Sequence, residues 1–157
     1  MPDAPAIVVG HRSTAGRGAR RLAYRCLLVA VGGFLGTLAR YGIGSAVDDV
    51  EGFPVATLSV NALGAFAFGV LLERLATRGA DPSRRRDLRL FAGTGFLGSF
   101  TTYSSFAVET ERLLATGASS TALGYLATSL VCGLAACVAG VTVADRYPTR
   151  GRGTGVR

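Results

Sequence analysis

The chain has 157 residues, 49% of them hydrophobic, and a formal net charge of +7. All 17 basic residues are arginines that gather at the two ends and in one loop without interleaved aromatic residues, which argues against a nucleic-acid-binding surface. The length fits a compact soluble domain or a small membrane bundle, and the hydropathy pattern favours the membrane. Four apolar segments each approach or exceed the roughly 20 residues that span a bilayer: Leu22–Val47, Phe53–Leu75, Leu88–Leu114 and Ala122–Ala144.

The composition divides the chain into three regions. Residues 1–21 are rich in arginine and glycine and are predicted to be a disordered tail. Residues 22–145 are predicted to form an all-α domain of four transmembrane helices, and residues 146–157 a second disordered basic tail. The first region does not resemble a secretory signal, because the apolar segment after it is too long and lacks a small-residue cleavage pattern.

The first apolar segment contains one charged residue, Arg40, about two turns before its end at Val47. A charge at this depth is costly unless it reaches the interface or finds a partner. Arg40 is therefore an arginine that extends to the interface, or a cation at a pore mouth that attracts anions, and the two are compatible. Gly32 and Gly36 form a small face on which another helix can pack closely.

Asn61 lies inside the second segment, where an amide must form hydrogen bonds. It either joins two helices or belongs to a functional site. Thr57 lies one turn before it on the same helical face and Gly64 lies three residues after it, which favours a polar strip along that face.

The third segment is predicted to be a broken helix. Gly93, Gly95 and Gly98 fall within six residues, and a run of hydroxyl side chains follows between aromatic rings. Irregular backbone at membrane depth is tolerated where it lines a site or a pore. The Gly-x-Gly-x-x-Gly spacing matches a dinucleotide-binding fingerprint, but no strand precedes it and no βαβ unit surrounds it, so this interpretation is rejected.

The positions of the reactive residue types argue against two classes of protein. Proton-coupled exporters need an acid or histidine inside the membrane, but the carboxylates of these segments lie near the segment ends: Glu73, Glu109 and Glu111. No nucleophile has a neighbouring base, because the only histidine is His11 in the tail, so an enzyme is not expected. Cysteines without Cys-x-x-Cys pairing predict packing rather than a metal site: Cys26, Cys132 and Cys137.

The remaining polar groups suit a small anion. The fourth segment places Tyr125, Ser129 and Gly133 on one helical face, and these hydroxyls add to those of the third segment. Aromatic rings are electropositive at their edges, and donors without a counter-charge suit weak conduction of an anion over several sites. The freed carbonyl groups of a broken helix suit a cation instead.

Four groups of residues, taken in chain order, resemble the Fluc (CrcB) family of small fluoride channels. They are Arg40-Tyr41, Val60-Asn61-x-x-Gly64, the motif Gly98-x-x-Thr101-Thr102-Tyr103-Ser104-Ser105-Phe106-x-x-Glu109, and Tyr125-x-x-x-Ser129-x-x-x-Gly133. The likeness covers all four apolar segments. It implies an antiparallel dimer of four-helix subunits in the cell membrane, with two fluoride pathways and a structural sodium ion at the centre.

The resemblance also implies roles for single residues. Gly98 and Thr101 would offer backbone carbonyl groups to sodium, while Arg40 and Glu109 would lie near the ends of the path. The fluoride pathway would be lined by Asn61, Tyr103, Ser104, Ser105, Phe106, Tyr125 and Ser129. The implied function is a subunit that lowers cytoplasmic fluoride by passive efflux, with sodium as a fixed structural charge.

Two positions depart from the family pattern. Tyr103 stands where phenylalanine is usual, and Ser99 where a second glycine is common. Tyrosine keeps the ring edge and adds a hydroxyl group that needs a partner.

The arginine distribution predicts a single orientation in the membrane. With four spans, the two tails and the second loop lie on one side and hold 15 of the 17 arginines, counting those at the span edges. Positive charge favours the cytoplasmic side, so both termini are predicted to be cytoplasmic. A homodimer of opposed copies needs nearly balanced charge, so the alternative is a heterodimer with a homologous subunit of opposite orientation.

Two alternatives from other classes stay open at this point. A small-molecule exporter requires an essential acid inside the membrane, which the apolar segments lack. A non-conducting partner subunit, retained for assembly, requires that Asn61 and Phe106 tolerate substitution while Gly98 does not.

Overall fold

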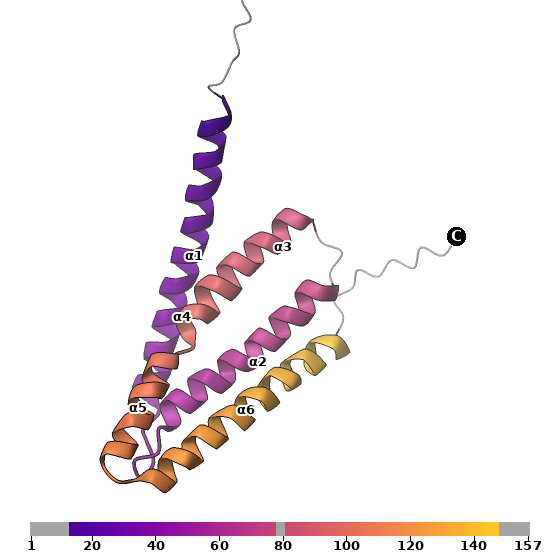
Figure 1. Ribbon diagram of the computed structural model, residues 1–157. Coiled ribbons are helices and arrows are strands. Elements are labelled where there is room, and N and C mark those ends of the chain that lie inside the picture. Colours follow the sequence, from indigo (N-terminus) through magenta and orange to yellow (C-terminus); the bar gives the residue numbers. More distant parts are fainter. Residues whose placement is uncertain (1–12, 78–80, 148–157) are drawn as a thin grey trace, which may run out of the picture.

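The computed structural model describes residues 13–77 and 81–147, and within these ranges the chain is almost entirely helical (Figure 1). The long helices are α1 (Ser13–Ala46), α2 (Val55–Thr77) and α6 (Ser119–Arg146). Helix α1 begins inside the predicted disordered tail, so residues 13–21 are helical where disorder was expected. Residues 1–12 of that tail, and the second tail from residue 148, lie outside the described residues.

Three helices in the described part of the chain are long and apolar enough to cross a membrane: Gly16–Ala46, Val55–Ala76 and Ser119–Arg146. Their large side chains face outward, for example Phe34, which is 64% exposed, and Leu130, which is 65% exposed. A soluble protein of this size buries such side chains, whereas a lipid-facing surface does not. The prediction of helices that are able to span a membrane is therefore confirmed for the first, second and fourth segments.

The third segment is a series of helical pieces. It consists of α3 (Pro82–Leu88), the π-helix η1 (Arg89–Leu97), α4 (Gly98–Phe100) and α5 (Tyr103–Ala115). Thr101 and Thr102 have extended backbone angles and separate α4 from α5. The interruption thus lies inside the stretch that the glycine and hydroxyl pattern marked as broken, and π-helical turns are frequent at functional sites.

The helices pack in two groups (Figure 1). Helix α2 packs against α6, and α1 packs against η1 and α4. Glycines permit this close approach. A Cβ atom on Gly36 of α1 would collide with the Phe96 carbonyl oxygen, and one on Gly140 of α6 would collide with the Phe66 carbonyl oxygen. The small face predicted in the first segment is therefore the contact surface for the π-helix.

Candidate functional site

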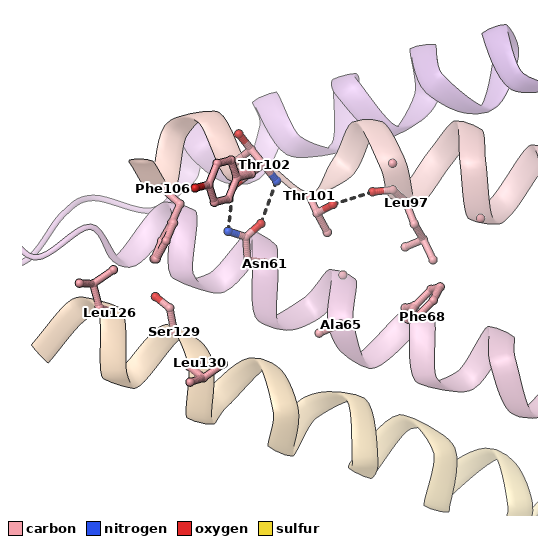
Figure 2. Close-up of a pocket in the computed structure, with 14 residues that line it drawn as sticks. Asn61, Ala65, Phe68, Leu97, Thr101, Thr102, Phe106, Leu126, Ser129 and Leu130 are labelled. Atoms are coloured by element: carbon pink, nitrogen blue, oxygen red, sulfur yellow. Dashed lines mark hydrogen bonds between the residues drawn. The ribbon is translucent and has the colours of Figure 1, made fainter. Parts of the chain in front are cut away.

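The interruption is held by one side chain from α2. The Asn61 amide nitrogen donates to the Thr102 carbonyl oxygen at 3.1 Å, and the Asn61 amide oxygen accepts from the Thr102 N–H at 2.8 Å (Figure 2). Thr102 is 7% exposed, so neither backbone group relies on solvent. An amide side chain is suited to this position because it offers a donor and an acceptor side by side.

The Thr102 side chain then starts α5. Its hydroxyl oxygen accepts from the Ser105 N–H at 3.1 Å, which is the usual N-cap hydrogen bond of a helix. The same hydroxyl donates to the Ser105 Oγ at 3.1 Å and lies 3.2 Å from the Ser104 Oγ. Three hydroxyl groups therefore meet at the first turn of α5.

These hydrogen bonds leave two carbonyl groups without their helical donors. In a continuous α-helix the Gly98 carbonyl would accept from the Thr102 N–H, and the Thr101 carbonyl from the Ser105 N–H. Here the Thr102 N–H donates to Asn61 and the Ser105 N–H donates to Thr102 Oγ1. Oxygen atoms released in this way from a broken helix are typical ligands for a small hard cation.

A groove of about 590 Å³ runs beside the interruption, between α2, the pieces of the third segment, and α6 (Figure 2). Its polar lining includes Asn61, Thr101, Thr102 and Ser129. Figure 2 shows Ser129 pointing from α6 into this groove, and its buried hydroxyl oxygen has no hydrogen-bond partner among the described residues. Among the described residues that line the groove, none is charged.

Aromatic rings form a row at the end of the groove. Tyr103 and Phe106 lie 6.2 Å apart between ring centroids, Phe106 and Tyr125 lie 5.2 Å apart, and both pairs are tilted. Tyr125 also receives the ring of Phe53 edge-on at 5.5 Å. Tilted rings point their electropositive edges toward neighbouring groups, so this row can contact an anion without carrying a formal charge.

Glu109 on α5 is the acid nearest to these rings. The Thr57 hydroxyl donates to one carboxylate oxygen at 2.7 Å, and the Tyr125 hydroxyl donates to the other at 2.8 Å. Helices α2, α5 and α6 are thereby joined through one carboxylate. Hydrogen bonds to a charged acceptor are stronger than neutral ones, so this cluster fixes the ring of Tyr125 against Phe106.

Comparison with known proteins identifies the family. The family model described as "CrcB-like protein, Camphor Resistance (CrcB)" matches residues 27–141. The chain belongs to the CrcB family.

Similar curated proteins are named as fluoride-specific ion channels. The chain is 50% identical over 117 residues to the "Fluoride-specific ion channel FluC 2" of Leifsonia xyli subsp. xyli, which covers 74% of this chain and 81% of that relative. It is 48% identical over 118 residues to the "Fluoride-specific ion channel FluC" of Paracoccus denitrificans, covering 74% of this chain and 91% of the relative. A FluC protein of Thermus thermophilus is 49% identical over 112 residues, 70% of this chain and 86% of that relative. These relatives are ion channels and not enzymes, which confirms that expectation.

The CrcB chain gathers most of the residues singled out from its sequence. Six of them line the groove: Asn61, Gly98, Thr101, Tyr103, Phe106 and Ser129. Ser104 and Ser105 meet the Thr102 hydroxyl, and Tyr125 and Glu109 pack behind Phe106. Arg40 is half-buried on α1 and does not line the groove.

Two residues at the centre of this geometry were not singled out for the site. Thr102 was predicted only as one hydroxyl donor of the third segment and part of the family motif, and Thr57 only as a neighbour of Asn61 on a polar face. The one-turn spacing of Thr57 and Asn61 was the available signal for the first contact. The double role of Thr102 depends on the extended backbone at the break, which the sequence pattern does not specify.

Proposed function

We propose that this chain is a subunit of a fluoride-selective channel that lowers cytoplasmic fluoride by passive efflux. Its family and the names of its relatives support this. The observation that carries the proposal is the uncharged groove, where hydroxyl and amide groups lie beside tilted aromatic rings. Neutral donors hold an anion weakly enough to release it, as conduction requires.

The path for fluoride would follow these groups. The Ser129 hydroxyl is free to donate into the groove, and the second N–H of the Asn61 amide is a further donor, since one N–H already serves Thr102. Ring edges of Tyr103 and Phe106 would contact the ion between these donors. Fluoride crosses the membrane as HF in acidic surroundings and dissociates inside, so an open path returns the anion down its gradient without a coupled ion.

An antiparallel dimer is part of the proposal. The groove is open on one side, and Tyr103 is 81% exposed beside it. The groove is bounded by α2, the third segment and α6, and a second subunit packed against this open face would close the path. The three long apolar helices and the interrupted third segment would give each subunit four membrane-crossing segments.

A structural sodium ion would fit the interruption. The helical donors of the Gly98 and Thr101 carbonyl groups are diverted to other acceptors, and backbone oxygens suit a hard monovalent cation. Opposed copies would double this set of oxygens at the dimer centre. The ion would neutralise the carbonyl dipoles and lock the two interruptions together. Replacing sodium by a bulky organic cation should then lower the melting temperature of the dimer, and an unchanged melting temperature would contradict this site.

The arginine distribution supports a single orientation with both termini in the cytoplasm. Arg84, Arg85 and Arg86 lie on α3, at the same end of the bundle as the start of α1 and the end of α6 (Figure 1). Such a bias directs insertion one way. We therefore favour a heterodimer with an oppositely oriented homologue over a homodimer. Reporter fusions at the C-terminus that were equally active on both membrane faces would contradict this orientation.

The deciding experiment measures fluoride efflux from liposomes that contain the purified chain, with chloride as the control ion. Fast efflux of fluoride alone, lost in Phe106→Ile and Asn61→Asp, would establish a self-sufficient channel. Efflux only when a homologous second subunit is co-expressed would establish the heterodimer. No fluoride efflux in either preparation would overturn the channel proposal and favour a non-conducting assembly subunit.

A further inference from the structure

A second cavity of about 450 Å³ lies at the arginine-rich end of the bundle, away from the groove. It is lined by Pro82, Arg85, Arg86, Arg89, Leu90 and Thr94. We propose that this cavity binds a phosphate group, carried by an anionic phospholipid or free in solution. The inference does not depend on the proposed channel function, because the cavity shares no lining residue with the groove.

The cavity is positive because of the helical register. Arg89 follows Arg86 by three residues and Arg85 by four, which places its side chain beside both of them on the surface of α3 and the start of η1. Like charges at these spacings repel each other. A bound anion would remove this repulsion, and a guanidinium group matches phosphate oxygens with two parallel hydrogen bonds.

The nearby acids are directed elsewhere. Asp87 accepts a hydrogen bond from the Tyr24 hydroxyl on α1 at 3.2 Å, and Asp81 accepts from Ser83. Neither carboxylate is among the described residues that line the cavity. Asp81 still acts electrostatically on Arg86, but within the described part of the chain the cavity lining carries positive charge and no carboxylate.

One arginine atom is left without a partner. The Nε of Arg85 is buried and has no hydrogen-bond partner among the described residues. A buried charged donor without a partner is costly, and a phosphate oxygen would satisfy it. The Thr94 hydroxyl offers a further donor, while Pro82 and Leu90 give an apolar wall that suits the glycerol and first acyl carbons of a lipid.

The position in the fold suits a headgroup. Helix α3 lies at the end of the bundle where α1 begins and α2 and α6 end (Figure 1). Basic pockets between transmembrane helices near the membrane surface are typical binding places for anionic headgroups. The contact between Tyr24 and Asp87 ties this end of the third segment to α1, so a bound headgroup would brace the segment that leads to the interruption.

The test uses the full chain in detergent and native mass spectrometry, with phosphatidylglycerol or phosphatidylcholine of identical acyl chains as probes. A separate arm adds inorganic phosphate and records the melting temperature. The variant is Arg85→Gln with Arg89→Gln. Its matched control is Arg20→Gln with Arg84→Gln, which removes the same charge at the same end of the bundle from exposed arginines outside the cavity.

We expect phosphatidylglycerol to bind the wild type and the control variant about tenfold more tightly than the cavity variant, a difference of about 1.4 kcal/mol. Stabilisation by inorganic phosphate, lost in the same variant, would identify free phosphate as the ligand. If the cavity variant does not fold, Arg86→Lys keeps the charge and removes the two-pronged hydrogen bonding, and its affinity should fall severalfold. Equal affinities of the cavity and control variants for phosphatidylglycerol would overturn the proposal. So would the absence of both a preference for phosphatidylglycerol over phosphatidylcholine and a stabilisation by inorganic phosphate.

Discussion

Asn61 on α2 binds both backbone groups of Thr102, at 2.8 Å from its N–H and 3.1 Å from its carbonyl oxygen. A single side chain thus satisfies both backbone groups of Thr102 at the interruption. The pair also explains how extended backbone persists within an apolar segment, where each unpaired group would cost several kcal/mol.

Replacing Asn61 by leucine should destabilise the chain strongly. Both backbone groups of Thr102 would lose their partner, and each unsatisfied buried group costs about 1–3 kcal/mol, so the free energy of unfolding should fall by about 2–6 kcal/mol. Chemical unfolding in detergent measures it. Ser59→Ala on the same helix is the control and should change little. Equal effects of the two substitutions would contradict the role of Asn61.

The Thr102 hydroxyl should control the start of α5. Thr102→Val keeps the shape and removes the N-cap, which contributes about 1 kcal/mol. The amide of Ser105 should then exchange its hydrogen faster, and hydrogen-exchange mass spectrometry on the first turn of α5 records it. Thr102→Ser keeps the hydroxyl group and should restore the protection. A serine variant as unprotected as the valine variant would show that the hydroxyl is not the cause.

Glu109 should couple Thr57 to Tyr125 through its two carboxylate oxygens. Tyr125→Phe removes a hydrogen bond to a charged acceptor, so we expect a loss of about 1.5–3 kcal/mol of unfolding free energy. In a Glu109→Gln background the same substitution should cost less, because the acceptor is no longer charged. A double-mutant cycle measures the difference. Strict additivity of the two substitutions would mean that the carboxylate does not act on Tyr125.

The first turn of α3 should depend on pH through Asp81. Hydrogen bonds from the Ser83 hydroxyl and N–H hold the pKa of this carboxyl group below its usual 3.8. A lowered pKa in the folded state means that the contribution to stability is present above the usual value and is lost as the pH falls through the folded value.

Hydrogen exchange of the α3 amides, corrected for intrinsic rates, should therefore show a loss of protection between about pH 5 and pH 2. Asp81→Asn keeps an acceptor oxygen without a titrating group, so its protection should vary much less. A wild type and an asparagine variant with the same pH profile would contradict this assignment.

The sequence predicted the membrane-crossing helices well, because a run of apolar residues long enough to span a bilayer has few other uses. It also placed the interruption near Gly98 and Phe106, since glycines and hydroxyl groups are poor constituents of a lipid-exposed helix. It did not predict that α1 begins at Ser13. The helix extends beyond its apolar part into the arginine-rich stretch, where the good helix propensity of arginine supports it.

The site was predicted less completely than the helices. Asn61 stood out because an amide in an apolar segment needs a partner, but the sequence does not name that partner. Thr102 and Thr57 bind groups 41 and 52 residues away in the chain. Contacts at such separations follow from the packing of α2 against the third segment, which depends on glycine positions and on the backbone angles at the break.

The last prediction tests that packing. Gly140→Ala on α6 adds a Cβ that would collide with the Phe66 backbone carbonyl of α2, and backbone cannot move aside as a flexible side chain can. Overpacking of this kind costs about 1–3 kcal/mol, so the melting temperature should fall. Gly124→Ala on the same helix is the control, because no atom lies within 4 Å of its added Cβ.

Alanine is the better helix former by about 1 kcal/mol, so Gly124→Ala should leave the melting temperature unchanged or raise it. The two substitutions therefore move stability in opposite directions although they make the same chemical change on one helix. A fall of equal size in both would mean that alanine is poorly tolerated along the whole of α6. In that case the close contact of α2 and α6 at Gly140 would not be what positions Ser129 along the groove.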